Sequence, residues 1–502
     1  MLVIQKEKIE YPEKILFEHE RLVVSSNKII AIVGANGTGK TTFLNRIVES
    51  LQNGNHQVEF DGSYVMVHQI AETTDPLSGG EKVKKALNKA FARKPRLLLL
   101  DEPSANLDET TQRWLSKHLK EYHGVVLLVS HDVDLLNLAN ETWLIKNKKL
   151  EVFPGNYAFT EDILNNRENK QERAYNQQQR EIHRLEQQIA KREQRAYRIK
   201  KGNGKKLSNS DKKALSRTSH DQMEKKMQRS AKALERRLER MPKIEKVAKS
   251  QVVRFIDPNE AKYLRSTVLI VKNQTIKFGK KILIEDVNFK LKYGQKLWLR
   301  GNNGSGKTTL VKTILNNREK FIAPNVGVGY FSQELQDIDL KETVWNNAAK
   351  DSLQNKQVIY TVLGGLDLKQ IHQKASELSG GQLVRLQLAK VLLGNNQFLI
   401  LDEPTNYLDL ETKNSLQQFL QNYPGTILLI SHNRQFAKTV TDNVLMITNK
   451  KLLTREQRQQ YDSADQGNIL KLQMKLDQLI SDPTVSLEEI KQVQMKIRMS
   501  QK

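Results

Sequence analysis

Short apolar runs recur along the chain and are separated by longer polar segments. The first set is "KIIAIV" at 28–33, "RLLLL" at 96–100 and "VVLLV" at 125–129, and the second is "KLWLR", "QFLIL" and "TILLI" at 296–300, 397–401 and 426–430. Runs of this length with polar flanks predict buried strands. Because the same order of runs occurs twice, the chain is expected to contain one α/β unit in two copies.

The middle of the chain has a different pattern, with apolar residues at helical spacing on both sides of a loop. They are Ile182, Leu185, Ile189, Ala196 and Ile199 before the loop, and Met223, Met227, Ala231, Leu234, Leu238 and Met241 after it. Spacings of three, four and seven predict amphipathic helices. The glycines and small polar residues of "GNGKKLSNS" at 202–210 break helices. We expect two long antiparallel helices, the first over about 164–200, with Pro242 near the end of the second.

Two glycine-rich loops follow apolar runs and predict phosphate binding. "GANGTGKT" begins at Gly34 and "GNNGSGKT" at Gly301, and both fit G-x-x-x-x-G-K-[ST]. The glycines let backbone N–H groups close around a β-phosphate, and the helix that follows points its positive end at the same anion. The lysines expected to reach the β- and γ-phosphates are Lys40 and Lys307, and the expected Mg²⁺ ligands are Thr41 and Thr308.

Two acidic pairs end predicted strands and complete the chemistry of an ATPase. "RLLLLDEP" ends in Asp101 and Glu102, and "QFLILDEP" ends in Asp402 and Glu403. A buried strand that delivers an Asp to Mg²⁺ and a Glu to water is the second part of a P-loop site. Two further repeats accompany the acids: the runs "VVLLVSH" and "TILLISH" end in His131 and His432, and "LSGG" begins at Leu77 and Leu378.

Charge and composition narrow the class of partner. The net charge is +24, and residues 161–250 carry 26 Lys and Arg against 13 Asp and Glu. A basic chain of this kind predicts a polyanionic partner, with nucleic acid ahead of a membrane surface. The sequence has no Cys, which excludes disulfides, iron–sulfur clusters and Cys-zinc sites. With no long apolar run and no signal-peptide pattern at the start, we expect a cytoplasmic protein.

In this order, these motifs resemble those of the ABC ATPases. The resemblance implies two composite sites, each holding ATP between the phosphate loop of one half and the LSGG signature of the other. It implies catalytic roles for Glu102, Glu403, His131 and His432. The implied metal ligands are Thr41, Gln69, Asp101, Thr308, Gln333 and Asp402. The implied ATP-binding residues are Tyr11, Gly34, Asn36, Gly37, Gly39, Lys40, Thr41, Thr42, Ser78, Gly79 and Gly80 in the first half, and Phe278, Gly301, Asn303, Gly304, Gly306, Lys307, Thr308, Thr309, Ser379, Gly380 and Gly381 in the second.

Two aromatic residues are assigned to adenine stacking, and the two halves differ between their motifs. Tyr11 and Phe278 each lie 29 residues before the loop lysine of their half, although both could instead be strand core. Gln69 to Ser78 spans 9 residues, whereas Gln333 to Ser379 spans 46. The first half therefore lacks most of the helical subdomain with which a transporter motor docks onto its membrane subunits.

Two ABC cassettes joined by a basic helical hairpin resemble the ABC-F family, in particular its antibiotic-resistance members. That resemblance implies a protein that binds the ribosomal E site with ATP and Mg²⁺. Its hairpin would reach the P-site tRNA and the peptidyl transferase centre. It would then protect the ribosome from lincosamides, pleuromutilins and streptogramin A, and leave on hydrolysis. The basic residues expected to bind RNA are Arg195, Arg198, Lys200, Lys201, Lys205, Lys206, Lys212, Lys213 and Arg217.

Several alternatives stay open at this point. The chain could be an ABC-F translation factor that relieves stalled ribosomes without a drug, a DNA-maintenance ATPase or a transporter motor, and the middle could be a solvated linker. We expect a monomer with the following domains: ABC domain one at 1–160, the basic hairpin at 161–250, ABC domain two at 251–455, and a helical C-terminal extension at 456–502.

Overall fold

The computed structural model describes residues 1–11, 14–68, 79–104, 107–202, 210–244, 255, 266–332, 338–406, 408–454 and 457. It divides into two compact units. The larger unit contains residues Met1–Tyr157 and Ser250–Lys502, and the smaller unit is Ala158–Lys249. The expected C-terminal extension at 456–502 lies outside the described residues, apart from position 457.

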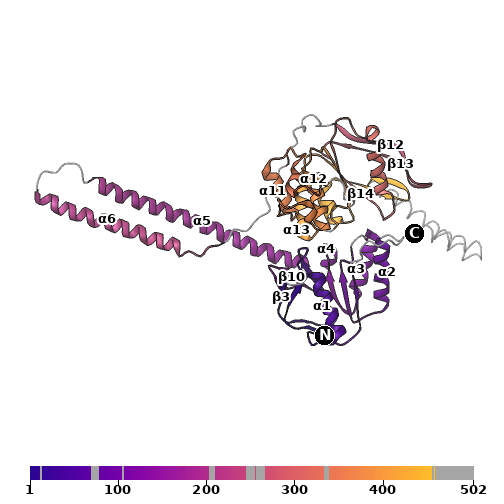
Figure 1. The fold of residues 1–502 in the computed structure, drawn as a ribbon, viewed down its shortest axis with the longest axis horizontal. Coiled ribbons are helices and arrows are strands. Elements are labelled where there is room, and N and C mark those ends of the chain that lie inside the picture. Colours follow the sequence, from indigo (N-terminus) through magenta and orange to yellow (C-terminus); the bar gives the residue numbers. More distant parts are fainter. Residues whose placement is uncertain are drawn as a thin grey trace, which may run out of the picture. The chain divides into compact units, whose positions relative to one another are not determined.

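The first half of the larger unit is a mixed sheet covered by helices (Figure 1). The eight strands lie in the order β2 (Glu7–Tyr11), β3 (Lys14–His19), β11 (Lys149–Pro154), β10 (Glu141–Lys146), β5 (Ile29–Gly34), β9 (Val125–Val129), β8 (Leu97–Asp101) and β7 (Tyr64–Val67). A small sheet has the order β4 (Leu22–Val24), β1 (Leu2–Ile4) and β6 (Val58–Phe60). The helices are α1 (Lys40–Asn53), α2 (Gly79–Ala92), α3 (Glu109–Lys120) and α4 (Val133–Leu136).

The second half repeats this sheet strand for strand. Its order is β12 (Thr267–Phe278), β13 (Lys281–Lys292), β19 (Lys451–Thr454), β18 (Asn443–Thr448), β14 (Lys296–Arg300), β17 (Thr426–Ile430), β16 (Phe398–Asp402) and β15 (Val328–Phe331). Its helices are α8 (Lys307–Asn316), α9 (Arg318–Phe321), α10 (Val344–Ala349), α11 (Lys356–Gly365), the short η1 (Ala375–Glu377), α12 (Gly380–Leu393), α13 (Leu410–Gln421) and α14 (Arg434–Val440). The predicted duplication of an α/β unit is therefore confirmed.

The apolar runs form the central strands because each is covered on both faces. Strands β8, β9, β16 and β17 are buried along their whole length. Residues of β16 and β17 alternate between two cores of the second half, one centred on α10–α13 and the other on α8 and β12. A parallel sheet covered in this way needs continuous apolar strands, and its strand ends converge at one edge.

The smaller unit is a hairpin of two antiparallel helices, α5 (Tyr157–Gly202) and α6 (Ser210–Glu239) (Figure 1). Arg192 donates to the Ser230 carbonyl at 3.1 Å, and Arg237 pairs with Glu181 at 3.3 Å. Of the predicted helix breakers, Gly202 is the last residue of α5 and Ser210 is the first residue of α6. The others lie at 203–209, outside the described residues. Helix α5 has 46 residues, which corresponds to about 69 Å at ~1.5 Å per residue.

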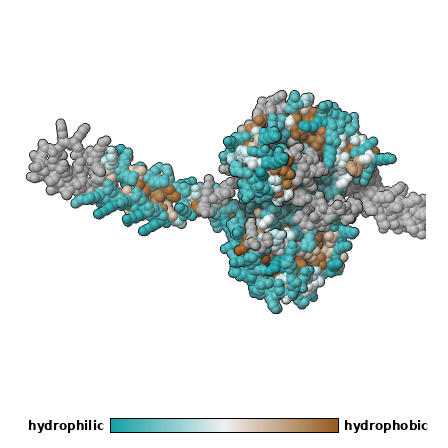
Figure 2. Space-filling model, in the orientation of Figure 1, coloured by the Kyte–Doolittle hydropathy of each residue, from teal (hydrophilic) through white to brown (hydrophobic). Residues whose placement is uncertain are grey.

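The hairpin differs from the sequence-based expectation at its ends. Helix α5 begins at Tyr157, seven residues before the expected start at 164. In the predicted seams, Leu185, Ala196 and Ala231 are buried, but Met223 is 52% exposed. A two-helix hairpin covers each helix on one side only, so the seam is narrow. Figure 2 accordingly shows a largely hydrophilic surface with a limited apolar stretch on this unit.

We predict that Leu185→Ala destabilises the hairpin locally. The side chain is 2% exposed, so its removal should lower the local stability by about 2–3 kcal/mol. Amide hydrogen exchange in α5 and α6 should speed up, whereas the exposed change Glu193→Ala on the same helix should leave it unaltered. Equal exchange rates in the two variants would contradict this packing.

Candidate functional site

Each phosphate loop connects a central strand to a helix and holds its lysine inside the loop. Lys40 Nζ donates to the carbonyls of Gly34 and Ala35 at 2.8 and 2.9 Å. Lys307 does the same with Gly301 and Asn302 at 2.8 and 3.0 Å. Both lysines are buried, and burial lowers the pKa of each. A buried ammonium whose hydrogen-bond partners among the described residues are carbonyls is well placed to turn towards an incoming phosphate.

The glycine before each lysine is required by the backbone. Gly39 and Gly306 both have φ of 100°, which L-residues with a side chain rarely adopt. A Cβ on Gly39 would lie 2.8 Å from Leu16 Cδ1, and one on Gly306 would lie 3.0 Å from Leu283 Cβ. The two loops therefore share one conformation, in which successive N–H groups form an anion-binding concavity.

A threonine and an aspartate form the same pair at both loops. Thr41 Oγ1 donates to Asp101 Oδ2 at 2.8 Å, and Thr308 Oγ1 donates to Asp402 Oδ2 at 2.8 Å. Asp101 Oδ1 is buried without a hydrogen-bond partner among the described residues. A hydroxyl beside a carboxylate with a free oxygen suits Mg²⁺, which takes few protein ligands and completes its shell with phosphate and water. The described residues contain no group of three or more His, Cys, Asp or Glu side chains that could hold a metal by themselves.

In each half, the glutamate next to this aspartate contacts the histidine that follows a central strand, His131 or His432. The His131 N–H donates to Glu102 Oε2 at 3.2 Å, and His131 Nε2 lies 3.4 Å from Oε1. The corresponding distances between His432 and Glu403 are 3.2 and 3.5 Å. Both glutamates have left-handed backbones, with φ of 49° and 53°. The two carboxylates are therefore aimed in the same way.

Burial dominates the titration of these groups. It raises the pKa of Glu102 to about 7, although Lys413 and Lys40 oppose the shift. It raises the pKa of Glu403 to about 8, with a further contribution from Asp402. Burial also lowers the pKa of His131 and of His432, the latter to about 4, so both rings are neutral at pH 7. A carboxyl with a pKa near neutrality suits a group that accepts a proton from water.

The first site opens into a cavity of about 530 Å³. Its lining combines Lys40, Thr41 and Glu102 of the first half with Gly381 and Lys413 of the second. The lining also includes Glu403 and His432, which belong to the second site. Gly381 belongs to the LSGG segment, where Ser379 caps α12 and a Cβ on Gly381 would meet open space. One cavity therefore brings a phosphate loop and the opposite signature together.

Direct hydrogen bonds join the two halves at the same places. The Asn36 N–H donates to Asp409 Oδ2 at 3.0 Å, and the Asp108 carboxylate accepts from the Asn303 N–H. Lys413 Nζ donates to the His131 carbonyl at 3.1 Å. A separate ion cluster surrounds Glu109, which accepts from Arg300 Nε at 2.7 Å and from Arg434 at 3.0 Å.

The two aromatic candidates lie at strand ends and are not core residues. Tyr11 ends β2, is 67% exposed and lines the first cavity. Phe278 ends β12 and is 74% exposed. The alternative of strand core is therefore wrong for both, and adenine stacking stays a prediction.

Gln69, Ser78, Gln333, Lys205 and Lys206 lie outside the described residues. Gly79 and Gly80 begin α2, and Gly380 begins α12. Arg195 and Arg198 are exposed on α5, whereas Lys200, Lys201, Lys212, Lys213 and Arg217 are placed only as positions within α5 or α6.

Sequence reasoning missed the contacts across the halves made by Lys413, Glu109, Arg300 and Arg434. A signal was present in the duplicated motifs, because Lys413 lies four residues after Asp409, where the first half has Gln112. The partners of these side chains are distant in sequence, so spacing alone could not identify them.

This fold and site define a pair of ABC-type nucleotide-binding domains in one chain. The family model described as "ABC transporter" matches residues 18–75 and 284–406. The RNase-L Inhibitor structure has a similar fold, with a TM-score of 0.56 at 18% identity over 92% of each chain. The archaeal ribosome recycling factor aABCE1, solved with the stalk protein aP1, has a TM-score of 0.57 at 18% identity over 89% of this chain and 90% of that chain.

Two curated relatives extend over both halves and the hairpin region. The ribosome protection protein VmlR of Bacillus subtilis is 31% identical over 472 residues, which cover 88% of this chain and 85% of VmlR. The erythromycin resistance ATP-binding protein MsrA of Staphylococcus epidermidis is 30% identical over 456 residues, 84% of this chain and 92% of MsrA. The chain belongs to the ABC-F family of ABC ATPases, as its motifs suggested. No described helix has the length and apolar character needed to span a bilayer.

We predict that the buried glutamates make the fold less stable as the pH rises. A glutamate pKa of 4.5 in the unfolded chain against about 7 for Glu102 and about 8 for Glu403 means that the folded state binds more protons in between. Stability should fall from about pH 5 to pH 8, by on the order of 3 kcal/mol for Glu102. Glu102→Gln/Glu403→Gln should therefore melt above the wild type at pH 8, with the gap closing towards pH 5.

Thermal denaturation without nucleotide measures this effect. The control is Glu10→Gln/Glu285→Gln, because both residues are exposed on matching sheets. A gap that is constant with pH, or one that the control reproduces, would contradict the assignment.

Proposed function

We propose that this chain is a ribosome-protecting ATPase. It binds two ATP molecules between its halves, enters the ribosomal E site as a cytoplasmic monomer, and reaches the P-site tRNA and the peptidyl transferase centre with its hairpin. The observation that carries the proposal is the presence, in one chain, of two phosphate loops, each with its threonine–aspartate pair, and a long basic hairpin. Similarity to a ribosome protection protein over 88% of the chain supports it.

The site residues support a direct route for ATP hydrolysis. Lys40 leaves its loop carbonyls for the β- and γ-phosphates, and Gly381 closes the cavity from the other half. Glu102 accepts a proton from the water that attacks the γ-phosphorus, while the bond to the β-phosphate oxygen breaks and ADP leaves. Thr41 and Asp101 would hold Mg²⁺, which neutralises charge on the phosphates. The second site uses Lys307, Thr308, Asp402 and Glu403 in the same roles.

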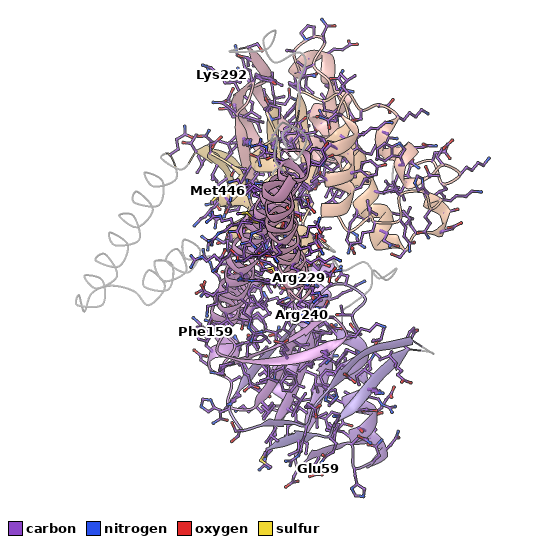
Figure 3. All side chains as sticks on the ribbon, turned by 90° about the vertical axis from the view of Figure 1, so that its left-hand side faces the viewer. Glu59, Phe159, Arg229, Arg240, Lys292 and Met446 are labelled. Atoms are coloured by element: carbon purple, nitrogen blue, oxygen red, sulfur yellow. The ribbon has the colours of Figure 1, made fainter. Side chains whose placement is uncertain are left out.

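The hairpin surface supports contact with RNA. Arg195 and Arg198 are exposed near the C-terminal end of α5. Arg229 is exposed on α6, and Arg240 is exposed in the turn just after it (Figure 3). Guanidinium groups bind phosphates without reading sequence, and such binding weakens with salt. Tyr197, 63% exposed between the two arginines of α5, offers a face on which an unpaired base can stack.

The drug class follows from the proposed position of the hairpin. A basic tip near the peptidyl transferase centre would displace tRNA or distort the pocket in which lincosamides, pleuromutilins and streptogramin A bind. MsrA is named for resistance to erythromycin, so that drug belongs in the same test panel.

We predict that Glu102→Gln/Glu403→Gln traps the chain on ribosomes. The amides keep the shape of the ATP sites but cannot take a proton from water, so ATP should bind and stay uncleaved. Sedimentation through sucrose with ATP should recover most of the variant with ribosomes, and little of it without nucleotide. Recovery with DNA or with membranes instead would show a DNA-maintenance ATPase or a transporter motor.

We predict that the exposed arginines near the tip are needed for drug protection. Arg195→Glu/Arg198→Glu should remove the rise in inhibitory concentration that the wild-type chain gives in a susceptible cell. ATP hydrolysis by the free chain should stay within about twofold, because the sites lie in the other unit. The matched control is Lys170→Glu/Arg173→Glu, the same charge change at the other end of α5. No wild-type protection against any drug of the panel would favour the drug-independent translation factor.

A further inference from the structure

The two ATP sites differ in what the opposite half contributes. Lys413 lies on α13 of the second half, but its Nζ donates to the carbonyl of His131 in the first half, at 3.1 Å. Its charge interacts with the carboxylates of Glu102, Asp132 and Asp409. Lys413 lines the cavity together with Lys40 and Glu102, and Gln112 and Glu403 line the same cavity. The contact that assigns Lys413 to the first site is therefore its hydrogen bond to His131. A cation of the second half is therefore part of the wall of the first site.

The carbonyl that Lys413 binds belongs to the residue that holds the catalytic glutamate. The His131 N–H and ring contact the two oxygens of Glu102, and Nε2 also lies 3.2 Å from Asn36 Oδ1. A hydrogen bond to the His131 carbonyl restrains the rotation of the same residue. It therefore restrains the direction in which the N–H and ring face Glu102. Lys413 therefore affects Glu102 in two ways: by restraining His131 and by the electrostatic attraction of its charge.

In the second site, a histidine contacts the glutamate in the same way, but the position equivalent to Lys413 is not a lysine. His432 contacts Glu403 at 3.2 and 3.5 Å, which are nearly the distances of the first site. The position equivalent to Lys413 is Gln112, four residues after Asp108, and its Nε2 donates to the Leu107 carbonyl in its own half at 3.2 Å. Opposite the second site, the first half instead presents Glu109, which binds Arg300 and Arg434.

We propose that Lys413 is a positioning residue that the second half supplies to the first ATP site only. It holds the His131 segment against Glu102 while the halves are paired, so ATP cleavage at the first site depends on that pairing through one side chain. The described residues give the second site no such lysine, and it depends on the pairing through the Glu109 ion cluster. This inference rests on the proposed binding of each ATP between the halves.

Single-site chains test the proposal. Glu403→Gln leaves cleavage to the first site, and Glu102→Gln leaves it to the second. The measured quantity is the rate constant for the first phosphate formed per chain, over a range of ATP concentrations. In the Glu403→Gln chain, Lys413→Gln should slow cleavage about tenfold and change the half-saturating ATP concentration less than about twofold. Lys413→Arg should restore most of the rate, because it keeps a donor and a charge at this position.

Two matched controls separate positioning from general damage to the interface. In the Glu102→Gln chain, Lys413→Gln should leave the second site within about twofold. Lys146→Gln removes another cross-half lysine, which pairs with Glu411 at 3.7 Å on the exposed rim. This change should leave both sites unaltered, because exposed ion pairs contribute little.

The outcomes distinguish this inference from the proposed function. An unchanged rate for Lys413→Gln in a Glu403→Gln chain that does cleave ATP overturns the inference alone. An equal loss at both sites overturns it too, because the lysine would then only support the interface. If the Glu403→Gln parent cleaves no ATP, the first site does not work as proposed, and both proposals fail.

Discussion

The pairing of the two halves depends on the carboxylate of Asp409, which accepts hydrogen bonds from the backbones of both halves. One oxygen of Asp409 accepts from Thr412 N at 2.9 Å and caps α13, while the other accepts from Asn36 N in the opposite phosphate loop. The same fixed group therefore begins a helix in one half and shapes the loop of the other. Asp108 repeats both contacts with Thr111 and Asn303. Each phosphate loop is therefore held by a carboxylate of the opposite half.

The chemistry within each half could be predicted from the sequence, because short-range geometry determines it. A strand, a glycine-rich turn and a helix place Thr41 beside Asp101 in the first half. The same pattern places Thr308 beside Asp402 in the second. What could not be predicted is set by tertiary contact. The approach of Lys413 to His131 depends on how the two sheets face each other. Tyr11 and Met223 are exposed because no described neighbouring element covers them. The spacing of apolar residues along the chain does not predict which of them other elements will cover.

The fold is duplicated but the charges at its interface are not. Glu109 of the first half is equivalent to Leu410 of the second, and Gln112 is equivalent to Lys413. Each half therefore presents different side chains to the other. The catalytic groups make the same local contacts in the two halves. The distance from the histidine Nε2 to the glutamate Oε1 is 3.4 Å in the first half and 3.5 Å in the second. The asymmetry therefore lies between the halves, where it can alter one site without changing the chemistry of either.

The alanines buried in the hairpin determine its cross-section. Ala196 and Ala231 are 5% and 4% exposed, and such small residues let two helices approach towards the lower end of the usual 8–10 Å. With each helix about 10–12 Å across, the pair is only about 20 Å wide. A rod of this width can enter a passage that would exclude a globular domain of the same mass. Larger side chains at either alanine would thicken the rod at a point where no second layer of protein could absorb the change.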